Sequence, residues 1–272
     1  MGSPSRGSLS RDRATDARRA TAAHLPGYRI DSVVPLGEGE DNIACVVNGE
    51  LIVRFSKDPD PARRAAQVNN EARLLAAVAG FSPLPVPEPS FTVAEQGCLA
   101  YFTLPGLPLI DLPVSQRSAH ARSIAATLGE LLTALHRVPV GPMAELVDTD
   151  DQPKALWLRE AAETYAAIAE TVPMAHRPAV EAFLDAPPPT DRYALAFSHN
   201  DLGIEHVLID PATWTVTGVI DWSDAAIADP AHDFGLLYRD LGPAALSLAC
   251  ATTEPPHRLL LRPSARPLYA QP

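Results

Sequence analysis

Acidic and imidazole side chains gather in one short stretch of this chain, in two polar runs separated by apolar sequence. They are His199, Asp201, His206, Asp221, Asp224, Asp229 and Asp233. Such groups can accept protons, hold a divalent cation or cap helices. An Asp that follows the apolar pair Val219-Ile220 needs a cation or hydrogen-bond donors, because an unpaired buried carboxylate is costly. Capping alone would explain Asp229 before Pro230, but the set as a whole predicts a catalytic or metal site.

Two short strands must position these residues. The segments 207–209 and 215–220 are rich in β-branched residues, and Asp210-Pro211 between them is typical of a turn. Antiparallel strands joined in this way bring their outer ends together, so His206 and Asp221 are expected to lie side by side. Asp201 precedes His206 on the loop that leads into the hairpin.

The chain resembles a known family at these positions. The order His199-Asn200-Asp201, His206, Ile220-Asp221-Trp222 and Asp229-Pro230 with Asp233-Phe234 is similar to the catalytic core of the aminoglycoside phosphotransferase family. Within that family the sequence most resembles aminoglycoside 2″-phosphotransferases, and next macrolide 2′-phosphotransferases. The resemblance implies an α+β, two-lobed protein-kinase-like fold, with a small antiparallel-sheet N-lobe and a mainly helical C-lobe.

The resemblance also implies phosphoryl transfer from ATP or GTP to a hydroxyl of a small molecule. Asp201 would be the catalytic residue that orients and deprotonates the hydroxyl, and Asp221 would hold Mg²⁺ against the phosphates. His206 is the second expected metal residue. Because Mg²⁺ prefers oxygen donors, His206 could ligate the ion directly or hold a metal-bound water or a phosphate. His199 is expected to pack beneath the metal loop, and Asp233 to brace the catalytic loop.

The N-terminal part carries the expected nucleotide contacts. Strand-like sequence from Tyr28 leads into a glycine turn, where Gly37, Gly39 and Asn42 would let backbone amides approach phosphates; an ordinary hairpin would look much the same. Arg54 lies in an apolar strand and needs an anionic partner. Glu71 lies on the apolar face of a helix predicted over 61–79. The resemblance implies that Glu71 pairs with Arg54, which would contact the phosphates. Lys57 is the alternative phosphate contact.

The remaining expectations concern the hinge and the acceptor. Main-chain groups of Thr103 or Leu104 would bind the nucleotide base at an interlobe hinge. Helices are predicted around 115–137, from Ile124, Leu128, Leu131 and Leu135, and around 157–168. An acidic cleft would receive cationic acceptors in this family, although a solvated helix face is the default explanation for Glu145, Asp148, Asp150, Asp151, Glu160, Glu163 and Glu170.

Composition sets further limits. The chain has 272 residues, 46% hydrophobic residues and a net charge of −11, as in a globular protein large enough for two lobes. The negative charge argues against a nucleic-acid partner and suits a cationic substrate. The scattered Cys45, Cys98 and Cys250 predict no disulfide framework, which favours the reducing cytoplasm. No apolar run is long enough to span a membrane, and a monomer is expected.

Four segments are predicted. They are a disordered leader over 1–24, a nucleotide-binding N-lobe over 25–104 with the hinge at its end, a helical C-lobe over 105–246 with the catalytic loop and metal site, and an irregular tail over 247–272. The expected function is NTP-dependent phosphorylation of an aminoglycoside, with a macrolide or another small alcohol as the alternative acceptor. A nucleotide-binding relative without turnover is the alternative from another class, because the C-terminal part is short for this family.

Overall fold

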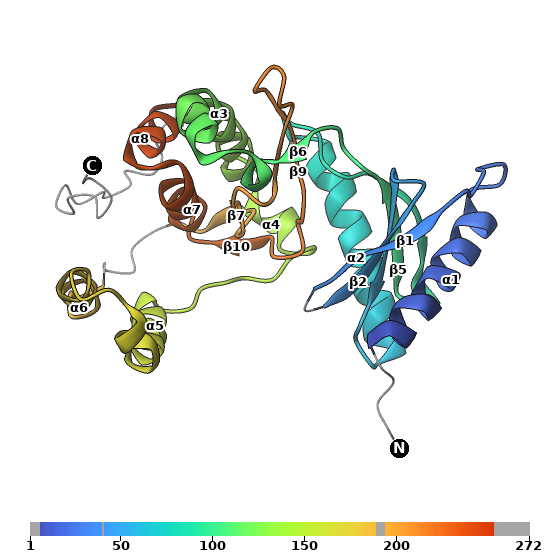
Figure 1. Cartoon of the computed structure of the whole chain (residues 1–272), viewed down its shortest axis with the longest axis horizontal. Helices are drawn as coiled ribbons and strands as arrows, with labels where there is room; N and C mark the ends of the chain where they lie inside the picture. Colours follow the sequence, from blue (N-terminus) through green and yellow to red (C-terminus); the bar gives the residue numbers. More distant parts are fainter. Residues whose placement is uncertain (1–5, 40, 189–193, 253–272) are drawn as a thin grey trace.

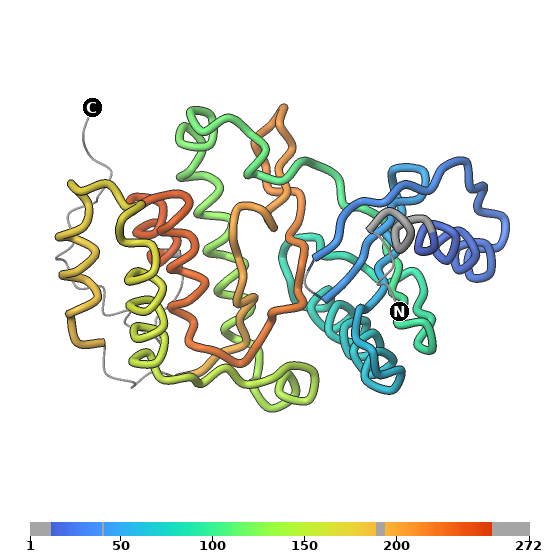
Figure 2. Tube along the Cα trace, turned by 60° about the horizontal axis from the view of Figure 1, so that its bottom comes forward, coloured from blue at the N-terminus to red at the C-terminus, as the bar shows by residue number. Residues whose placement is uncertain are grey.

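A computed structural model describes residues 6–39, 41–188 and 194–252, and it forms two lobes (Figures 1 and 2). The N-lobe contains an antiparallel sheet with a helix on each face, and the C-lobe is mainly helical. This arrangement confirms the predicted α+β class. Within the described residues, no helix is both long enough and apolar enough to cross a membrane.

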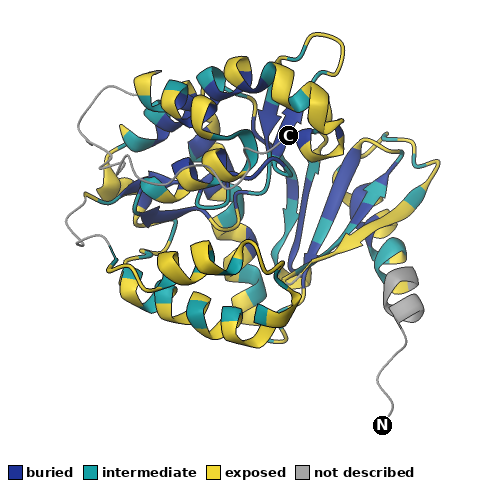
Figure 3. Ribbon diagram, turned by 60° about the vertical axis from the view of Figure 1, so that its left-hand side comes forward, coloured by how far each residue is buried: buried dark blue, intermediate teal, exposed yellow. Residues whose placement is uncertain are grey.

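One five-stranded sheet organises the N-lobe, in the order β1-β2-β3-β5-β4. The strands are β1 Val33–Glu38, β2 Asn42–Val47, β3 Leu51–Ser56, β4 Pro89–Val93 and β5 Cys98–Phe102. The central strand β3 is buried along nearly its whole length, whereas the edge strand β1 is exposed (Figure 3). The glycine turn joins β1 to β2, although β1 begins at Val33 and not at Tyr28. Arg54 is the only residue of β3 that is not buried, so the sheet presents this cation to the interlobe side.

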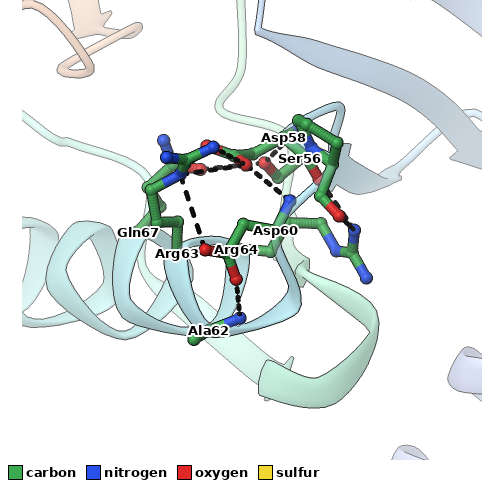
Figure 4. Close-up of polar contacts among 8 residues, drawn as sticks. Ser56, Asp58, Asp60, Ala62, Arg63, Arg64 and Gln67 are labelled. Carbon is green, nitrogen blue, oxygen red and sulfur yellow. Dashed lines mark hydrogen bonds and ion pairs between the residues drawn. The ribbon is translucent and has the colours of Figure 1, made fainter.

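Helix α2, Pro61–Ala79, covers one face of the sheet and begins and ends where the sequence predicts. The Asp60 carboxylate accepts a hydrogen bond from the Ala62 amide at 2.8 Å (Figure 4). Pro61 lies in the first turn, where a backbone N–H would have no acceptor within the helix. Ser56 at the end of β3 donates to Gln67 at 2.9 Å and ties the helix to the strand (Figure 4). The helix buries an apolar stripe against the sheet, which turns Glu71 inward: Val68, Leu74, Leu75 and Val78.

Helix α1, Arg6–His24, covers the other face of the sheet, so the prediction of a disordered leader over 1–24 was wrong for these residues (Figure 1). Ala17, Ala20 and Thr21 are buried against the sheet. The guanidinium of Arg13 lies 5.0 Å from the centre of the Phe55 ring, a cation–π contact. Hydrophobic periodicity does not predict this helix, because the residues that it buries against the sheet are small.

The C-lobe contains most of the helices and five short strands in two small sheets. Its helices are α3 Val114–His136, α4 Val140–Met143, α5 Lys154–Ile168, α6 Arg177–Leu184, α7 Ala231–Leu241 and α8 Pro243–Thr252. Its strands are β6 Leu107–Pro108, β7 Ala196–Ser198, β8 Val207–Ile209, β9 Val216–Val219 and β10 Ala226–Ala228. Single 3₁₀ turns occur at Ala94–Gln96 in the N-lobe, and at Leu109–Asp111 and Ala169–Thr171 in the C-lobe.

Helix α3 forms the spine of the C-lobe, and α7 and α8 pack against it. The stripe predicted for this helix is buried in full: Ile124, Leu128, Leu131 and Leu135. Helix α8 extends to Thr252, so the prediction of irregular structure was wrong for 247–252; the rest of the predicted tail lies outside the described residues. Ala245, Leu246 and Ala249 of α8 are buried, so two of these three contact residues are again small.

Helices α5 and α6 form a separate pair at the edge of the C-lobe (Figure 1). The Tyr165 hydroxyl of α5 donates to Glu181 of α6 at 3.1 Å. Neither helix contains a buried residue (Figure 3). Large apolar side chains such as Trp157 and Phe183 remain exposed. The predicted helix is therefore present, but its apolar stripe does not enter the core of the lobe.

Two small sheets position the polar loops. Strands β8 and β9 form the predicted antiparallel hairpin, with β6 beside β8. Strands β7 and β10 pair antiparallel, and Thr149 adds a parallel bridge to Ile227 in β10. The loops that leave β7 and β9 carry most of the residues singled out in the sequence.

Candidate active site

The loop after β7 carries His199, Asn200 and Asp201, and Asp233 of α7 holds it in place. The two carboxylate oxygens of Asp233 accept hydrogen bonds from the amides of His199, at 3.1 Å, and Asn200, at 2.9 Å. Asn200 has a φ of 66°, in the left-handed region that Asn tolerates better than most residues. Asp233 is fully buried, and this burial raises its pKa to about 7 against the opposing effect of the amide donors. Asp233 therefore braces the loop, as predicted.

His199 links the same loop to the end of β9. Its Nε2 lies 3.1 Å from the carbonyl oxygen of Ile220, and its Nδ1 lies 3.3 Å from the amide of Asp201. A neutral ring satisfies both contacts when Nε2 carries the proton and Nδ1 accepts. Burial lowers the pKa of His199 to about 4, so the neutral form persists at pH 7. His199 thus has a structural role, as predicted.

His206 bridges Asp201 and Asp221. Its Nδ1 lies 2.8 Å from the carbonyl oxygen of Asp201 and 3.4 Å from the Asp201 carboxylate, while its Nε2 lies 3.7 Å from the Asp221 carboxylate. The Ile220 amide donates to the His206 carbonyl at 2.9 Å and closes the base of the hairpin. The expectation that His206 and Asp221 lie side by side is confirmed.

Carboxylates crowd the space next to Asp221. Burial raises the pKa of Asp224, and the charges of Asp201, Asp221 and Asp41 raise it further. Burial disfavours the charged form of Asp221 as well, but a hydrogen bond from Ser223 and the charge of Arg54 outweigh it, so the pKa of Asp221 is lowered. Asp221 is therefore an anion in an electronegative region that a cation would stabilise.

This donor set fits Mg²⁺. Within the described residues, no three His, Cys, Asp or Glu side chains are arranged to enclose a metal ion. Mg²⁺ does not need such a cage in phosphoryl-transfer sites, because phosphates and waters complete its shell around one or two carboxylates. Asp221, whose φ of 60° turns the backbone sharply after β9, is the carboxylate suited to this role.

A larger cavity of about 850 Å³ lies between the lobes and reaches Asp221. It contains most of the predicted nucleotide contacts among its lining residues: Gly37, Gly39, Asn42, Arg54, Thr103 and Leu104. Its floor in the C-lobe includes Leu208, Ile220, Asp221, Ser223 and Asp224. The glycine turn and the predicted metal residue Asp221 therefore line the same cavity.

Arg54 and Glu71 form the ion pair that the sequence predicted, at 2.9 Å. Both side chains are largely buried, with 13% and 18% exposed. Burial raises the pKa of Glu71, whereas the Arg54 charge lowers it; the guanidinium stays charged because Glu71 offsets its desolvation. Tyr101 on β5 also raises the pKa of the Arg54 guanidinium. Arg54 lines the larger cavity, and Glu71 supports it from behind.

Lys57 and the Thr103 amide, both considered as nucleotide contacts, make hydrogen bonds within the N-lobe. The Lys57 ammonium donates to the Gly39 carbonyl at 3.0 Å and lies 3.2 Å from Glu38, so Lys57 fastens the glycine turn. The Thr103 amide donates to the Glu50 carbonyl at 2.7 Å. Because this amide completes the sheet, the Thr103 groups that remain for a base are its carbonyl and side chain.

A smaller cavity of about 380 Å³ lies beside the catalytic loop, between the starts of α5 and α7. Asn200, next to Asp201, lines it, together with Asp150, Gln152, Lys154, Trp157, Ala228, Asp229, Ala231, His232, Gly235 and Leu236. Lys154, Trp157 and His232 were not predicted as site residues. Trp157 begins the helix predicted around 157–168, and that pattern predicted only packing.

The acidic cleft suggested by the sequence is only partly assembled. Of the seven acidic residues named for it, Asp150 alone lines the smaller cavity. Glu145, Glu160, Glu163 and Glu170 are exposed side chains outside that lining. The default explanation of a solvated helix face therefore accounts for them.

The chain is similar to known proteins in sequence and in structure. The sequence matches the model of the phosphotransferase enzyme family over residues 32–255. The GDP complex of wild-type aminoglycoside 2'-phosphotransferase-IIIa is similar in structure, with a TM-score of 0.70 and 26% identity over 88% of this chain and 82% of that chain. Macrolide 2'-phosphotransferase MphH from Brachybacterium faecium is also similar, with a TM-score of 0.60 and 25% identity over 88% and 82% of the two chains.

A curated relative is matched over a shorter stretch. Uncharacterized protein YcbJ from Bacillus subtilis (strain 168) is 46% identical over 54 residues, which are 19% of this chain and 17% of that protein. This stretch is too short to transfer a function, but the family match covers both lobes. The two-lobed kinase-like fold and the resemblance deduced from the sequence are confirmed, and the chain belongs to the phosphotransferase enzyme family, as a phosphotransferase with an alcohol group as its acceptor.

Proposed function

We propose that this phosphotransferase transfers the γ-phosphoryl group of ATP or GTP to a hydroxyl of a small-molecule antibiotic, an aminoglycoside or a macrolide. The observation that carries the proposal is that the linked residues of the site reach two cavities. Asp221 lines the larger cavity, and Asn200, the neighbour of Asp201, lines the smaller one. The nucleotide would occupy the larger cavity and the acceptor the smaller one.

The larger cavity offers groups suited to a nucleoside triphosphate. Arg54, held by Glu71, would contact the phosphates, while the backbone of Gly37 and Gly39 would lie over them. The base would lie near Leu104 and the Thr103 carbonyl at the junction of the lobes. The similar 2'-phosphotransferase-IIIa structure is a GDP complex, which supports a nucleotide as co-substrate here.

Mg²⁺ would supply charge neutralisation for the phosphates when it is bound. Asp221 would hold the ion, and His206 would contribute its Nε2 or orient a bound water, because the contact with the Asp201 carbonyl fixes the proton on Nδ1. Burial and the carboxylates of Asp201, Asp221 and Asp41 raise the pKa of Asp224, which supports this position for a cation.

Asp201 would act on the acceptor. Its carboxylate is 39% exposed, in a loop held by Asp233 and by the ring of His206, so it can reach a substrate hydroxyl. The hydroxyl oxygen would form a bond to the γ-phosphorus as the bond from that phosphorus to the bridging β–γ oxygen breaks, and the hydroxyl proton would pass to Asp201. The nucleoside diphosphate leaves, and most of the rate enhancement comes from positioning and charge neutralisation.

Release of nucleoside diphosphate tests the proposal. The protein is supplied with Mg²⁺ and either ATP or GTP, and with a panel of several aminoglycosides and one macrolide. Acceptor-dependent release is expected with at least one compound, and mass spectrometry should find the acceptor heavier by one phosphoryl group. Binding of nucleotide without turnover of any acceptor would instead favour the non-catalytic relative.

Two variants separate catalysis from binding. Asp201→Asn should reduce turnover by about 100-fold or more while nucleotide affinity is retained, because the amide cannot accept the proton. Asp221→Ala should weaken nucleotide binding in the presence of Mg²⁺ and have little effect in the presence of EDTA. Persistent turnover in Asp201→Asn, or unchanged Mg²⁺-dependent affinity in Asp221→Ala, would refute the assigned role.

A further inference from the structure

Two carboxylates converge at the smaller cavity because of the strand directions. Thr149 pairs in parallel with Ile227, and the amide of Asp150 donates to the Ile227 carbonyl at 2.9 Å. Asp150 and Asp229 follow these two segments, so both leave the small sheet at the same edge. Both residues line the smaller cavity.

Lys154 changes the charge of this cavity. Its ammonium, at the first residue of α5, forms an ion pair with the Asp229 carboxylate. The other Asp229 oxygen accepts from the Ala231 amide at 3.0 Å and caps α7. Asp229 is thus already occupied by a cation and a helix terminus. The Asp150 carboxylate accepts a long hydrogen bond of 3.4 Å from the Gln152 amide and still lines the cavity, so the formal charge on the lining is two carboxylates against one ammonium.

The remaining wall is apolar and aromatic. Trp157, one turn after Lys154 on α5, is 48% exposed, and its ring lies 6.4 Å from that of His232 on α7. Ala228, Ala231 and Leu236 complete this side of the cavity. An exposed indole beside aliphatic residues suits the apolar face of a ligand.

We propose that Lys154 determines acceptor specificity by limiting the positive charge that the smaller cavity accepts. The preferred acceptor would present a hydroxyl to Asp201, an apolar face to Trp157 and at most one ammonium group to Asp150. This inference deepens the proposed function and depends on it. It favours the macrolide class over polycationic aminoglycosides, in contrast to the acceptor expected from the sequence.

The physical reason is the cost of placing several ammonium groups beside Lys154. A polycation would either lie close to a like charge in a partly enclosed space or have to break the Lys154–Asp229 pair. A ligand with one ammonium can pair with Asp150 and avoid both costs. Repulsion of this kind selects among ligands as effectively as added attraction.

The test compares two acceptors across three variants. Catalytic efficiency, kcat/KM, is measured for kanamycin, which carries several ammonium groups, and for a macrolide with a single dimethylammonium group. Lys154→Gln removes the charge, Lys154→Arg retains it, and Arg159→Gln removes a charge from the exposed part of the same helix outside the cavity lining.

The wild type should favour the macrolide. Lys154→Gln should raise the kanamycin-to-macrolide ratio of kcat/KM on the order of tenfold, and added salt should reduce that gain. Lys154→Arg and Arg159→Gln should leave the ratio near the wild-type value. A ratio within twofold of wild type in Lys154→Gln, or an equal loss for both acceptors, would overturn the inference, since an equal loss indicates a role in catalysis or support.

Failure of the proposed function can be recognised separately. If neither acceptor is turned over, the proposed function fails, and acceptor dissociation constants are measured by calorimetry on protein saturated with ADP and Mg²⁺. The same shift in preference between wild type and Lys154→Gln is then expected in the dissociation constants. Equal shifts for both acceptors in that measurement would refute the role of Lys154 independently of turnover.

Discussion

The Nε2 atom of His206 lies 3.7 Å from the carboxylate of Asp221, across the open end of the β8–β9 hairpin. The opposite nitrogen of the ring lies 2.8 Å from the Asp201 carbonyl oxygen. One imidazole therefore joins the loop that carries the proposed base to the residue proposed to hold the metal. Each ring nitrogen has a separate task, and the tasks can be separated by substitution.

His206→Asn and His206→Gln should differ in activity. The Asn amide can replace Nδ1 and keep the bond to the Asp201 carbonyl, whereas the Gln amide can replace only Nε2. We expect His206→Asn to retain kcat within about tenfold of wild type, and His206→Gln to lose about 100-fold, as for groups that orient an active-site ligand. Steady-state kinetics with Mg²⁺ and with Mn²⁺ would measure this. A more active Gln variant would show that Nε2 contributes more than the loop contact.

Loss of Glu71 should impair nucleotide use and stability together. Glu71→Ala leaves the largely buried Arg54 guanidinium without its anionic partner, which should cost about 2–3 kcal/mol of unfolding free energy, below the range for fully buried pairs. The KM for nucleotide should rise at the same time. Arg73→Ala, on the exposed face of the same helix, should change stability by less than about 0.5 kcal/mol and serves as the control. An equal effect of both substitutions in urea unfolding would argue against the pair.

Acid should destabilise the protein through His199. Burial lowers its folded-state pKa to about 4, below the value of about 6.5 in unfolded chains, so the unfolded state binds more protons between these pH values. The contribution of His199 to stability is complete above pH 6.5 and is lost as the pH falls toward 4, by about 3 kcal/mol in total. Asp233, with its raised pKa, acts in the opposite direction over an overlapping range.

The difference between wild type and His199→Asn isolates this effect, because Asp233 is present in both proteins. The unfolding free energy of wild type minus that of the variant should decrease steadily from pH 7 to pH 4. Denaturant titrations at several pH values would provide it. Parallel pH curves for the two proteins would mean that the His199 ring is not held neutral by burial.

Helix α1 should be required for the integrity of the N-lobe. Ala17→Arg places a long cation where the side chain is fully buried against the sheet, which should lower stability by about 1–3 kcal/mol. Cys45 and Cys98 are buried in the cluster that α1 covers, and burial raises the pKa of Cys98 to about 12. Their reaction with a thiol reagent should be faster in Ala17→Arg. The exposed Ala22→Arg is the matched control, and equal thiol reactivity in the two variants would refute the role of α1.

Much of the site could be predicted from the sequence because local rules place it. The turn at Asp210-Pro211 and the β-branched strands on either side require His206 and Asp221 to meet, since antiparallel strands leave no other geometry. The Asp60 cap and the apolar stripe of α2 likewise orient Glu71 toward Arg54. In each case the interaction follows from the periodicity of one or two neighbouring elements.

Other features depend on contacts between distant segments that leave no local pattern. The packing of α1 relies on alanines, the Thr103 amide is taken by Glu50, and the Lys154–Asp229 pair joins α5 to α7. Small, polar or exposed residues produce no hydrophobic periodicity, so their partners are determined only when the chain is folded. The chemistry of the catalytic loop was therefore predictable from the sequence, whereas the charge and shape of the proposed acceptor cavity emerged only from the arrangement of the lobes and helices in space.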